Sequence, residues 1–439
     1  MANMIRTFIR DFDEFGDALS ENTIYEEYYI MFNISLLYAP LKSFSISIVR
    51  FLQLVLTGIF HLYIITICLI TLVVARDDFI ASGGALIYAI IIFTFLIVLL
   101  HVISERKNIA KIHYIIGSGF YEYNETLSSE MIHIKSKYKQ LIWWIKRVIP
   151  VCTFLCGTVV MCLGPLIDRW AGVKVQEHPD NGINYNLPVP VWEPYDTNGP
   201  IPYWITVFSG ILSVTLSITV FISFNILYFT ISNYIACQLE LLKISIQNIE
   251  IRAKHLYMEY YKISTSEESL NDINELYSSY NFTECLKVCL KKNIEHHQVI
   301  LSLHHLANEV FSVPIFIFFF FGGMMVALAC YGAITVTGQP GTFWNFVNIS
   351  IIQMFTIGSM CKMGQALIDL HMNIRQEVYS INWYRYSTNI STSLIIIQQI
   401  CLRELIFEGP FGVTATLETF ADILNTTYSY FSLIVAWQS

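Results

Sequence analysis

The chain has 439 residues, of which 54% are hydrophobic and only 14% are charged, and its formal net charge at pH 7 is -8. It is far more apolar than a soluble enzyme, and its apolar runs are longer than strands or core helices need. The acidic balance and the scattered basic residues exclude a nucleic-acid-binding surface. We therefore predict an all-α membrane protein with lipid around it and no nucleic-acid partner.

Seven apolar stretches predict seven transmembrane helices, since about 20 apolar residues cross the hydrocarbon core. The first six cover residues 51–75, 84–103, 145–167, 205–237, 306–336 and 343–370. The fourth to sixth are long, and we expect the fourth to continue into the cytoplasm. The last helix is expected to be split into a cytoplasmic helix at 376–402, a Gly-Pro break at 408–412 and a membrane helix that ends at Trp437.

These stretches divide the chain into three regions. Residues 1–50 are a cytoplasmic N-terminal segment, and residues 51–370 hold helices 1 to 6, with an outer loop at 169–203 and cytoplasmic helical extensions at 239–305. Residues 371–439 hold the cytoplasmic helix and the seventh membrane helix. The outer loop is rich in proline and aromatic residues, which suit either a lid docked over a cavity or a plain connection.

The distribution of Lys and Arg predicts the orientation. The apolar stretches are separated by polar segments, the first of which precedes the first stretch. The first, third, fifth and seventh of these segments hold four, six, seven and three Lys or Arg residues, whereas the second, fourth and sixth hold one, two and none. Because basic residues are retained on the cytoplasmic side during insertion, the N-terminus is predicted to be cytoplasmic and the C-terminus extracellular.

The chain lacks the usual signatures of enzymes. It has no P-loop, no HExxH sequence and no nucleophile elbow, so we expect no enzymatic activity. None of the ten cysteines lies in a predicted outer loop, so no disulfide is expected. Cys285 and Cys289 lie near His296 and His297, but without a second spaced pair this is a weak metal signal, and no metal or other cofactor is predicted.

The last helix carries a polar stripe. Its members recur at intervals of four, three, four, three and four, which places them on one helical face: Glu418, Asp422, Asn425, Ser429, Ser432 and Ala436. One chain offers only one such stripe, so a water-filled pore would need several copies around an axis. The alternative is that the stripe packs against neighbouring helices, with Glu418 paired to Arg403.

The sequence near the C-terminus resembles a family signature. The run TLETF at 416–420, continuing through Ile423 and Leu424 to TYSYFSL at 427–433, is similar to the C-terminal signature of the insect odorant receptor family. The predicted orientation, the length and the split seventh helix extend the likeness along the chain, although the N-terminal half matches by pattern more than by motif.

This resemblance implies a ligand-gated, non-selective cation channel of four subunits in the plasma membrane of olfactory sensory neurons. Such a channel usually combines a tuned receptor with the family's shared co-receptor. The last helix would line the pore, with the hydrophobic constriction at Leu433 and with Ala436 one turn further out. The co-receptor pattern has valine and glutamine at these two positions, and the difference argues against conduction by a homomer.

The resemblance also implies a pocket for a small volatile odorant in the outer half of one subunit, among the second, third, fourth and sixth spans. Mostly aromatic, Met and aliphatic side chains would hold such a ligand by shape and dispersion. The residues at helical spacing are Ile87, Tyr88, Ile91, Phe154, Gly157, Met161, Trp204, Phe208, Leu212, Phe346, Ile349, Ser350 and Gln353.

Three other classes of membrane protein are alternatives to this assignment. A gustatory-type receptor would share the topology and the channel mechanism but would have a different C-terminal motif. A G-protein-coupled receptor would need the reverse orientation. A transporter would often show inverted repeats and broken helices, and the chain has no second broken span to match the seventh.

Overall fold

The computed structural model of the chain describes residues 44–117, 129–173, 182–261, 279–336 and 338–438. These residues are almost all helical, and β structure among them is limited to one isolated bridge between Glu408 and Thr414. The prediction of an all-α fold is therefore confirmed. The elements are α3 (Phe44–Val74), α4 (Phe79–Ser104), α5 (Arg106–Gly117), α6 (Ser129–Phe154), the π-helix η1 (Leu155–Val160), α7 (Met161–Trp170), α8 (Pro200–Gln247), α9 (Ile249–Tyr261), α11 (Tyr280–Thr335), α12 (Pro340–Ser380), the 3-10 turn η3 (Trp383–Arg385), α13 (Thr388–Ile400), the 3-10 turn η4 (Pro410–Gly412) and α14 (Leu417–Gln438).

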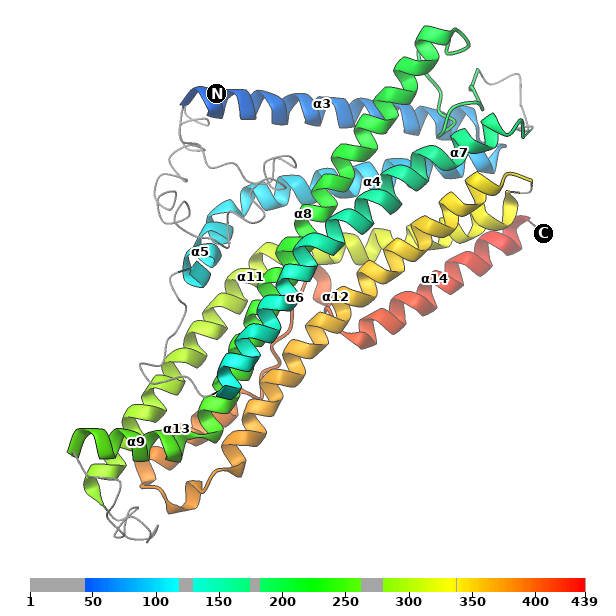
Figure 1. Ribbon diagram of the computed structural model, residues 1–439. Helices are drawn as coiled ribbons and strands as arrows, with labels where there is room; N and C mark the ends of the chain where they lie inside the picture. Colours follow the sequence, from blue (N-terminus) through cyan, green and yellow to red (C-terminus); the bar gives the residue numbers. More distant parts are fainter. Residues whose placement is uncertain (1–43, 118–128, 174–181, 262–278, 337, 439) are drawn as a thin grey trace.

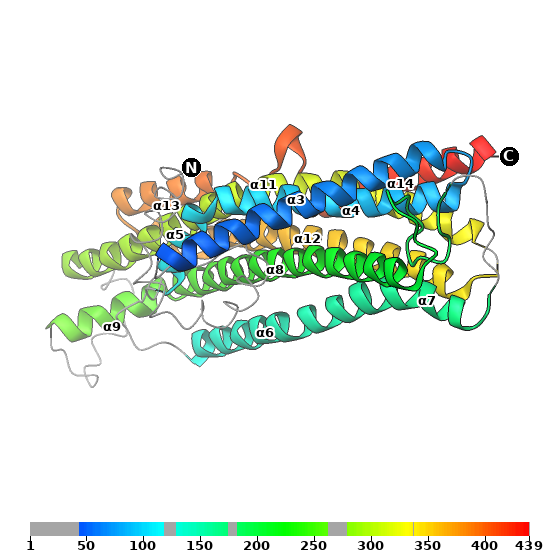
Figure 2. The same ribbon diagram turned by 90° about the horizontal axis from the view of Figure 1, so that it is seen from above.

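The long helices run side by side in an elongated bundle (Figures 1 and 2). Helices α8, α11 and α12 extend along most of its length; α7 and α14 lie toward the end that holds the C-terminus, and α9 and α13 lie at the opposite end. Helix α11 packs against α4, α8, α12 and α14, while α6 packs on α8 and α7 on α12. Helix α11 is thus the centre of the bundle.

Five helices are long and apolar enough to cross a membrane: Phe51–Val74, Ala81–Ser104, Pro200–Gln247, Tyr280–Thr335 and Pro340–Ser380. They contain five of the predicted spans. The third predicted span coincides with α6, η1 and α7, where Pro150 removes one backbone donor shortly before the π-helical turn, and the last coincides with α14. The count of seven and the orientation of the termini stay predictions.

Three helices are much longer than a bilayer requires. Helices α8, α11 and α12 have 48, 56 and 41 residues. At about 1.5 Å per residue they measure about 72, 84 and 62 Å, whereas the hydrocarbon core is about 30 Å thick. Each therefore extends well beyond one membrane crossing, as the sequence led us to expect.

The predicted cytoplasmic helix at 376–402 is wrong as a single element. Helix α12 continues to Ser380, the chain turns through η3, and α13 begins at Thr388. The turn docks on α9, because the hydroxyl of Tyr386 donates to Glu250 Oε1 at 2.6 Å and the amide of Asn382 donates to the same oxygen at 3.4 Å. These tertiary contacts break a segment that local sequence alone would continue as a helix.

The predicted break before the last helix is confirmed. Phe411 and Gly412 both have positive φ, at 62° and 74°, so the backbone between α13 and α14 leaves the right-handed helical region there. The segment crosses α11 closely, because Glu408 N donates to Asn308 Oδ1 at 2.8 Å and a Cβ at Gly409 would lie 2.8 Å from the carbonyl oxygen of Ser312. Only glycine fits at that crossing.

A buried carboxylate joins α7 to the start of α12. Asp168 accepts hydrogen bonds from the backbone N–H groups of Gly341 and Thr342, both at 2.7 Å, and from the Thr342 hydroxyl at 3.1 Å. It satisfies N–H groups that the first turn of a helix leaves without partners and places a negative charge at the positive end of the dipole. A Cβ at Gly341 would overlap the carbonyl of Gly164, so these two glycines allow the helices to meet there.

Aromatic side chains fill the middle of the bundle. Phe224 and Tyr228 of α8 contact Phe311 of α11, and Phe407 packs on Tyr228 and Phe311. All four side chains are fully buried. The segment that leads to α14 is therefore anchored in the core through Phe407 before α14 begins.

Candidate functional site

Residues 182–199, part of the predicted outer loop, cover a small cavity at the end of the bundle that holds α7 and the C-terminus. Residues 182–199 lie across α3, α4 and α8, and the loop is fixed by the N–H of Trp192, which donates to Thr71 Oγ1 at 2.8 Å, and by the hydroxyl of Tyr203, which donates to the Asn186 carbonyl at 3.1 Å. The enclosed space measures about 50 Å³. Of the two interpretations of this loop, a lid over a cavity fits the structure better than a plain connection does.

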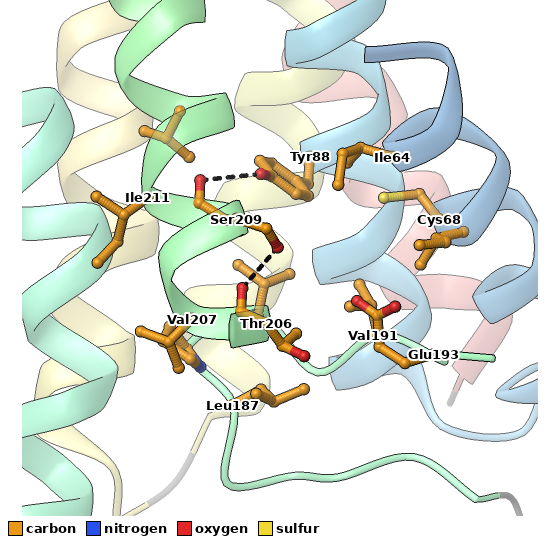
Figure 3. Close-up of a pocket in the computed structure, with 15 residues that line it drawn as sticks. Ile64, Cys68, Tyr88, Leu187, Val191, Glu193, Thr206, Val207, Ser209 and Ile211 are labelled. Atoms are coloured by element: carbon orange, nitrogen blue, oxygen red, sulfur yellow. Dashed lines mark hydrogen bonds between the residues drawn. The ribbon is translucent and has the colours of Figure 1, made fainter. Parts of the chain in front are cut away.

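The cavity is lined by three helices and the lid (Figure 3). Its lining is predominantly apolar, as is usual for sites that bind small organic molecules. The residues are Ile64, Ile67 and Cys68 of α3, Tyr88 of α4, Leu187, Pro188, Val189, Val191 and Glu193 of the loop, and Thr206, Val207, Ser209, Gly210, Ile211 and Val214 of α8.

Most polar groups of the lining already have partners. The hydroxyl of Tyr88 donates to the Gly210 carbonyl at 3.3 Å, and the hydroxyl of Ser209 donates to the Thr206 carbonyl at 2.8 Å. The Thr206 hydroxyl pairs with that of Tyr195 at 2.8 Å. A ligand here would meet hydroxyl groups that are already satisfied, so apolar contact would provide most of its affinity.

Glu193 is the acidic residue of the cavity wall. Its side chain is 8% exposed, and the hydroxyl of Tyr63 donates to its Oε2 at 3.3 Å. Burial raises the pKa of this carboxyl above its ordinary value, and the hydrogen bond from Tyr63 opposes the shift in part. The lid thus places a poorly solvated acid where a ligand with a hydrogen-bond donor would reach it.

The structure brings some of the predicted pocket residues together at a different place. Tyr88 lines the cavity. Ile87 and Ile91 of α4 instead pack with Phe346 and Ile349 of α12 in a separate buried cluster next to α11. Ser350 donates to the Phe346 carbonyl at 3.1 Å, and Gln353 is buried against Gly322 of α11.

The other predicted pocket residues lie away from the cavity. Trp204, Phe208 and Leu212 are 46%, 66% and 53% exposed, and the α8 residues between them line the cavity instead. Phe154 is also exposed, Gly157 lies against Ile218 with no room for a Cβ, and the side chain of Met161 lies outside the described part of the chain. Their assignment to the pocket stays a prediction.

Sequence reasoning missed the contributions of α3 and of the lid. Ile67 and Cys68 lie three and four positions after Ile64, which places all three on one helical face. The first span, however, was not part of the expected pocket. The face of α8 was also missed, because that helix is apolar on all sides and its periodicity does not mark the inner face. The aromatic and proline content of the loop was the usable signal.

Most of the polar stripe of α14 is exposed, and Asp422 also lines a groove between α11 and α14. Glu418, Asp422, Asn425, Ser429, Leu433 and Ala436 are exposed, and Ser432 is half-buried. The opposite face carries the buried Thr427, whose hydroxyl donates to the Gly323 carbonyl at 3.4 Å, and Phe420, which packs near Gly358 of α12. Among the described residues, Glu418 forms no ion pair with Arg403. Within one chain, the alternative in which the stripe packs against neighbouring helices is therefore not realised.

A second hollow lies beside α14. It is an open groove of about 460 Å³ between α11 and α14, with Leu86 of α4 at its edge. Its walls are mainly apolar and include Phe320 and Met324 of α11 and Tyr430 and Leu433 of α14. The groove therefore continues the surface that α14 offers to lipid or to another chain.

Together these features define a class: a multi-pass helical membrane protein with a lidded cavity at one end and a terminal helix whose polar face is mainly exposed. The family follows from comparison. A family model described as 7tm Odorant receptor matches residues 78–428. The chain belongs to the odorant receptor family, whose members are multi-pass membrane proteins of olfactory neurons.

Individual relatives match over a shorter stretch. The chain is 22% identical over 153 residues to the odorant receptor coreceptor of Drosophila melanogaster. The aligned stretch covers 34% of this chain and 31% of the relative. The chain is 23% identical over 148 residues to odorant receptor 85c of Drosophila melanogaster, which covers 33% and 37%. The matched part is thus about a third of the length of these relatives.

The fold is similar to that of a solved receptor. The insect olfactory receptor OR5 from Machilis hrabei, in complex with eugenol, superposes with a TM-score of 0.73 over 94% of this chain and 98% of that chain. The structure described without eugenol gives 0.65 over the same shares. Both are 12% identical to this chain, so the likeness concerns the fold.

Proposed function

We propose that the chain is an odorant receptor subunit of a ligand-gated, non-selective cation channel, assembled as a heterotetramer with a co-receptor subunit. The observation that carries the proposal is the orientation of α14: Thr427 is buried against α11, whereas Asp422, Asn425 and Ser429 on the opposite side are exposed. Polar groups in a membrane need protein or water beside them, and several copies around an axis provide both.

The ligand is proposed to be a small volatile hydrophobic molecule bound under the lid. The cavity of about 50 Å³ is smaller than the 300–1,000 Å³ of typical ligand pockets, so binding requires the loop to move outward or the helices to separate. Tyr88, Val191 and Ile211 provide apolar contact, and Glu193 provides the polar one. Binding opens the pore if the ligand stabilises the open arrangement of α14 more than the closed one.

The relatives support the proposed partners. One relative is named a coreceptor and the solved neighbour holds eugenol, a small volatile phenol, and both facts concern those proteins.

The proposed pore residues lie near the end of α14. This helix has serine at position 432, leucine at position 433 and alanine at position 436. We take residues 371–439 as the unit that carries the pore helix.

The test is electrical. We would express the chain with and without a co-receptor subunit and record whole-cell currents during application of a panel of volatile molecules. Rapid inward cation currents with the co-receptor, insensitive to inhibitors of G-protein signalling, are expected. Responses that need G-protein coupling, or substrate uptake without channel current, would contradict the proposal. Responses to non-volatile tastants alone would favour a gustatory-type channel.

A further inference from the structure

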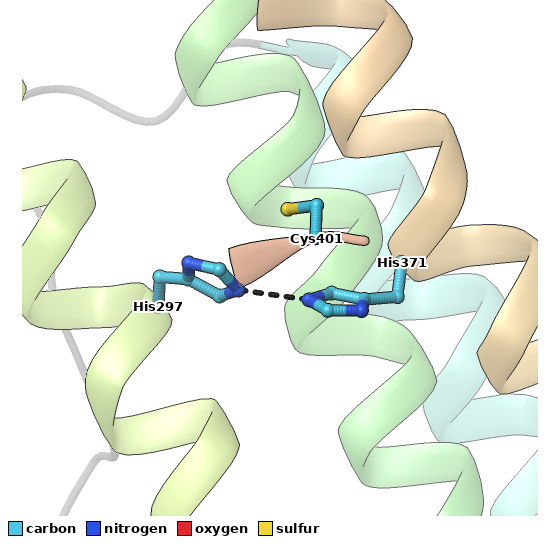
Figure 4. Close-up of side chains that lie close together, drawn as sticks. All are labelled: His297, His371 and Cys401. Atoms are coloured by element: carbon cyan, nitrogen blue, oxygen red, sulfur yellow. Dashed lines mark hydrogen bonds between the residues drawn. The ribbon is translucent and has the colours of Figure 1, made fainter. Parts of the chain in front are cut away.

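Three soft or borderline metal ligands converge in the part of the bundle away from the cavity (Figure 4). His297 comes from α11, His371 from α12 and Cys401 from the residue that ends α13. Their nearest nitrogen and sulfur atoms all lie within 4.8 Å of one another. They are 3%, 1% and 0% exposed, so the cluster lies in the interior of the bundle.

The two imidazole rings face each other through the same nitrogen. His297 Nε2 and His371 Nε2 are 3.0 Å apart, and the ring planes meet at 48°. A hydrogen bond between neutral rings accounts for this distance. It gives the Cys401 thiol no role. A cation held between the two Nε2 atoms and the Cys401 sulfur gives all three a partner.

The distances are close to those of a zinc site. Two nitrogens at about 2.0–2.1 Å from a tetrahedral zinc lie about 3.3 Å apart, and a thiolate sulfur at about 2.3 Å lies about 3.5 Å from each. The histidine pair at 3.0 Å needs to open by a few tenths of an ångström. The sulfur needs to approach by at most about 1.3 Å, because no separation exceeds 4.8 Å. Cys401 sits at a helix end, where such a movement disturbs few backbone hydrogen bonds.

We propose that His297, His371 and Cys401 form a zinc-binding site that cross-links α11, α12 and the end of α13, with water in the fourth position. Imidazole and thiolate are the ligand types that zinc takes in proteins. This site differs from the weak metal signal of Cys285 and Cys289 in the sequence. His297 and His371 are 74 positions apart in the chain, and His371 and Cys401 are 30 positions apart. The site is independent of odorant binding and of the pore assignment.

The position gives the ion a structural consequence. Cys401 lies 16 residues before Leu417, where α14 begins, and Phe407 between them is buried against α8 and α11. A zinc ion at Cys401 adds a second anchor to the segment that leads to α14. It thereby fixes the base from which α14 would move.

The experiment uses the purified full-length protein in detergent, supplied with zinc and then dialysed against metal-free buffer. Elemental analysis is expected to find about one zinc ion per chain. Replacement by cobalt(II) is expected to give a near-ultraviolet thiolate-to-cobalt charge-transfer band. Cys401→Ala should abolish the band, and His371→Gln, which can keep a hydrogen bond to His297, should weaken metal binding about tenfold or more.

Cys361→Ala is the matched control, since Cys361 is also fully buried and lies on α12 outside the cluster. It should keep both the zinc and the cobalt band. Folded wild-type protein that retains no zinc and gives no cobalt band overturns the proposal, whatever the variants do. A cobalt band that persists in Cys401→Ala also overturns it.

Discussion

Ile87 and Tyr88 are consecutive residues of α4, yet they face two different parts of the molecule. Tyr88 lines the cavity under the lid, whereas Ile87 packs in the cluster with Phe346 and Ile349, against which Ile434 of α14 also packs. One helix therefore touches the proposed ligand on one face and the contact surface of the proposed pore helix on another. Ile87 and Ile434 thus pack against the same buried cluster, which places a single layer of side chains between α4 and α14.

Tyr88→Ala is expected to change the dose-response curve without lowering surface expression. Loss of a cavity wall removes contacts worth about 1–3 kcal/mol, which corresponds to roughly a 5- to 150-fold change in the half-maximal concentration. Ile205→Ala is the matched control, because Ile205 lies on α8 at the same end of the bundle but is 57% exposed and outside the cavity. Phe208→Ala tests the predicted pocket residue on the exposed side of α8. A shift for Phe208→Ala alone would move the pocket to the outer face of α8.

Glu193→Gln is expected to lower sensitivity to volatile amines more than to neutral analogues of the same shape. Among the described residues, Tyr63 and Cys68 of α3 face the carboxyl, and both are mainly uncharged at neutral pH, so neither is a cationic partner of Glu193. Because burial raises the pKa of Glu193, acidification neutralises it at a higher pH than an ordinary carboxyl. Amine responses of the wild type should therefore fall as the outer solution is acidified, and those of Glu193→Gln should not. Equal acid sensitivity in both proteins would exclude Glu193 as the amine contact.

The double variant Glu418→Gln, Asp422→Asn is expected to lower cation conductance or divalent block while ligand sensitivity stays nearly unchanged. Both carboxylates are exposed on the stripe of α14, and fixed negative charge at a pore mouth raises the local concentration of cations. The effect should be larger at low ionic strength, since the screening length is about 8 Å at 0.15 M salt. Single-channel recording at two salt concentrations measures it. Identical conductance at both would place these carboxylates away from the ion path.

Leu433→Ser is expected to raise the current that flows without ligand. Leu433 is 62% exposed on the stripe side of α14, and an apolar ring closes a pore by excluding water from it. A hydroxyl at this position helps water to enter and so favours the conducting state. Val435→Ser, also exposed but off the stripe, is the control and should leave the resting current at the wild-type level.

The sequence predicted the helices well and the contacts between them less well. Apolar runs and glycine-proline breaks set local structure, so five of the spans and the break at Pro410 were predicted correctly. The turn at Trp383 was missed because it depends on a hydrogen bond from Tyr386 to Glu250, which lie 136 residues apart. No local pattern encodes that contact.

The sequence likewise predicted some features of the candidate site and not others. The stripe of α14 was visible because polar residues such as Asp422 and Ser429 stand out among apolar ones. The face of α8 toward the cavity was not, because Val207 and Ile211 are as apolar as the exposed Ile205 and Phe208. The convergence of His297, His371 and Cys401 also needed the structure, since three separate elements supply them.

The central claim is that the polar face of α14 lines a pore gated by a volatile ligand. The most direct measurement is the block of ligand-evoked current by a charged methanethiosulfonate reagent in the Ser429→Cys variant, co-expressed with a co-receptor subunit. Tyr430→Cys, exposed on the groove side of the same helix, and the wild type, which has its own cysteines, are the controls. The account predicts a rapid, ligand-dependent loss of current in Ser429→Cys that exceeds the change in both controls. Unchanged current in Ser429→Cys, with the cysteine chemically labelled and the protein at the cell surface, would contradict it.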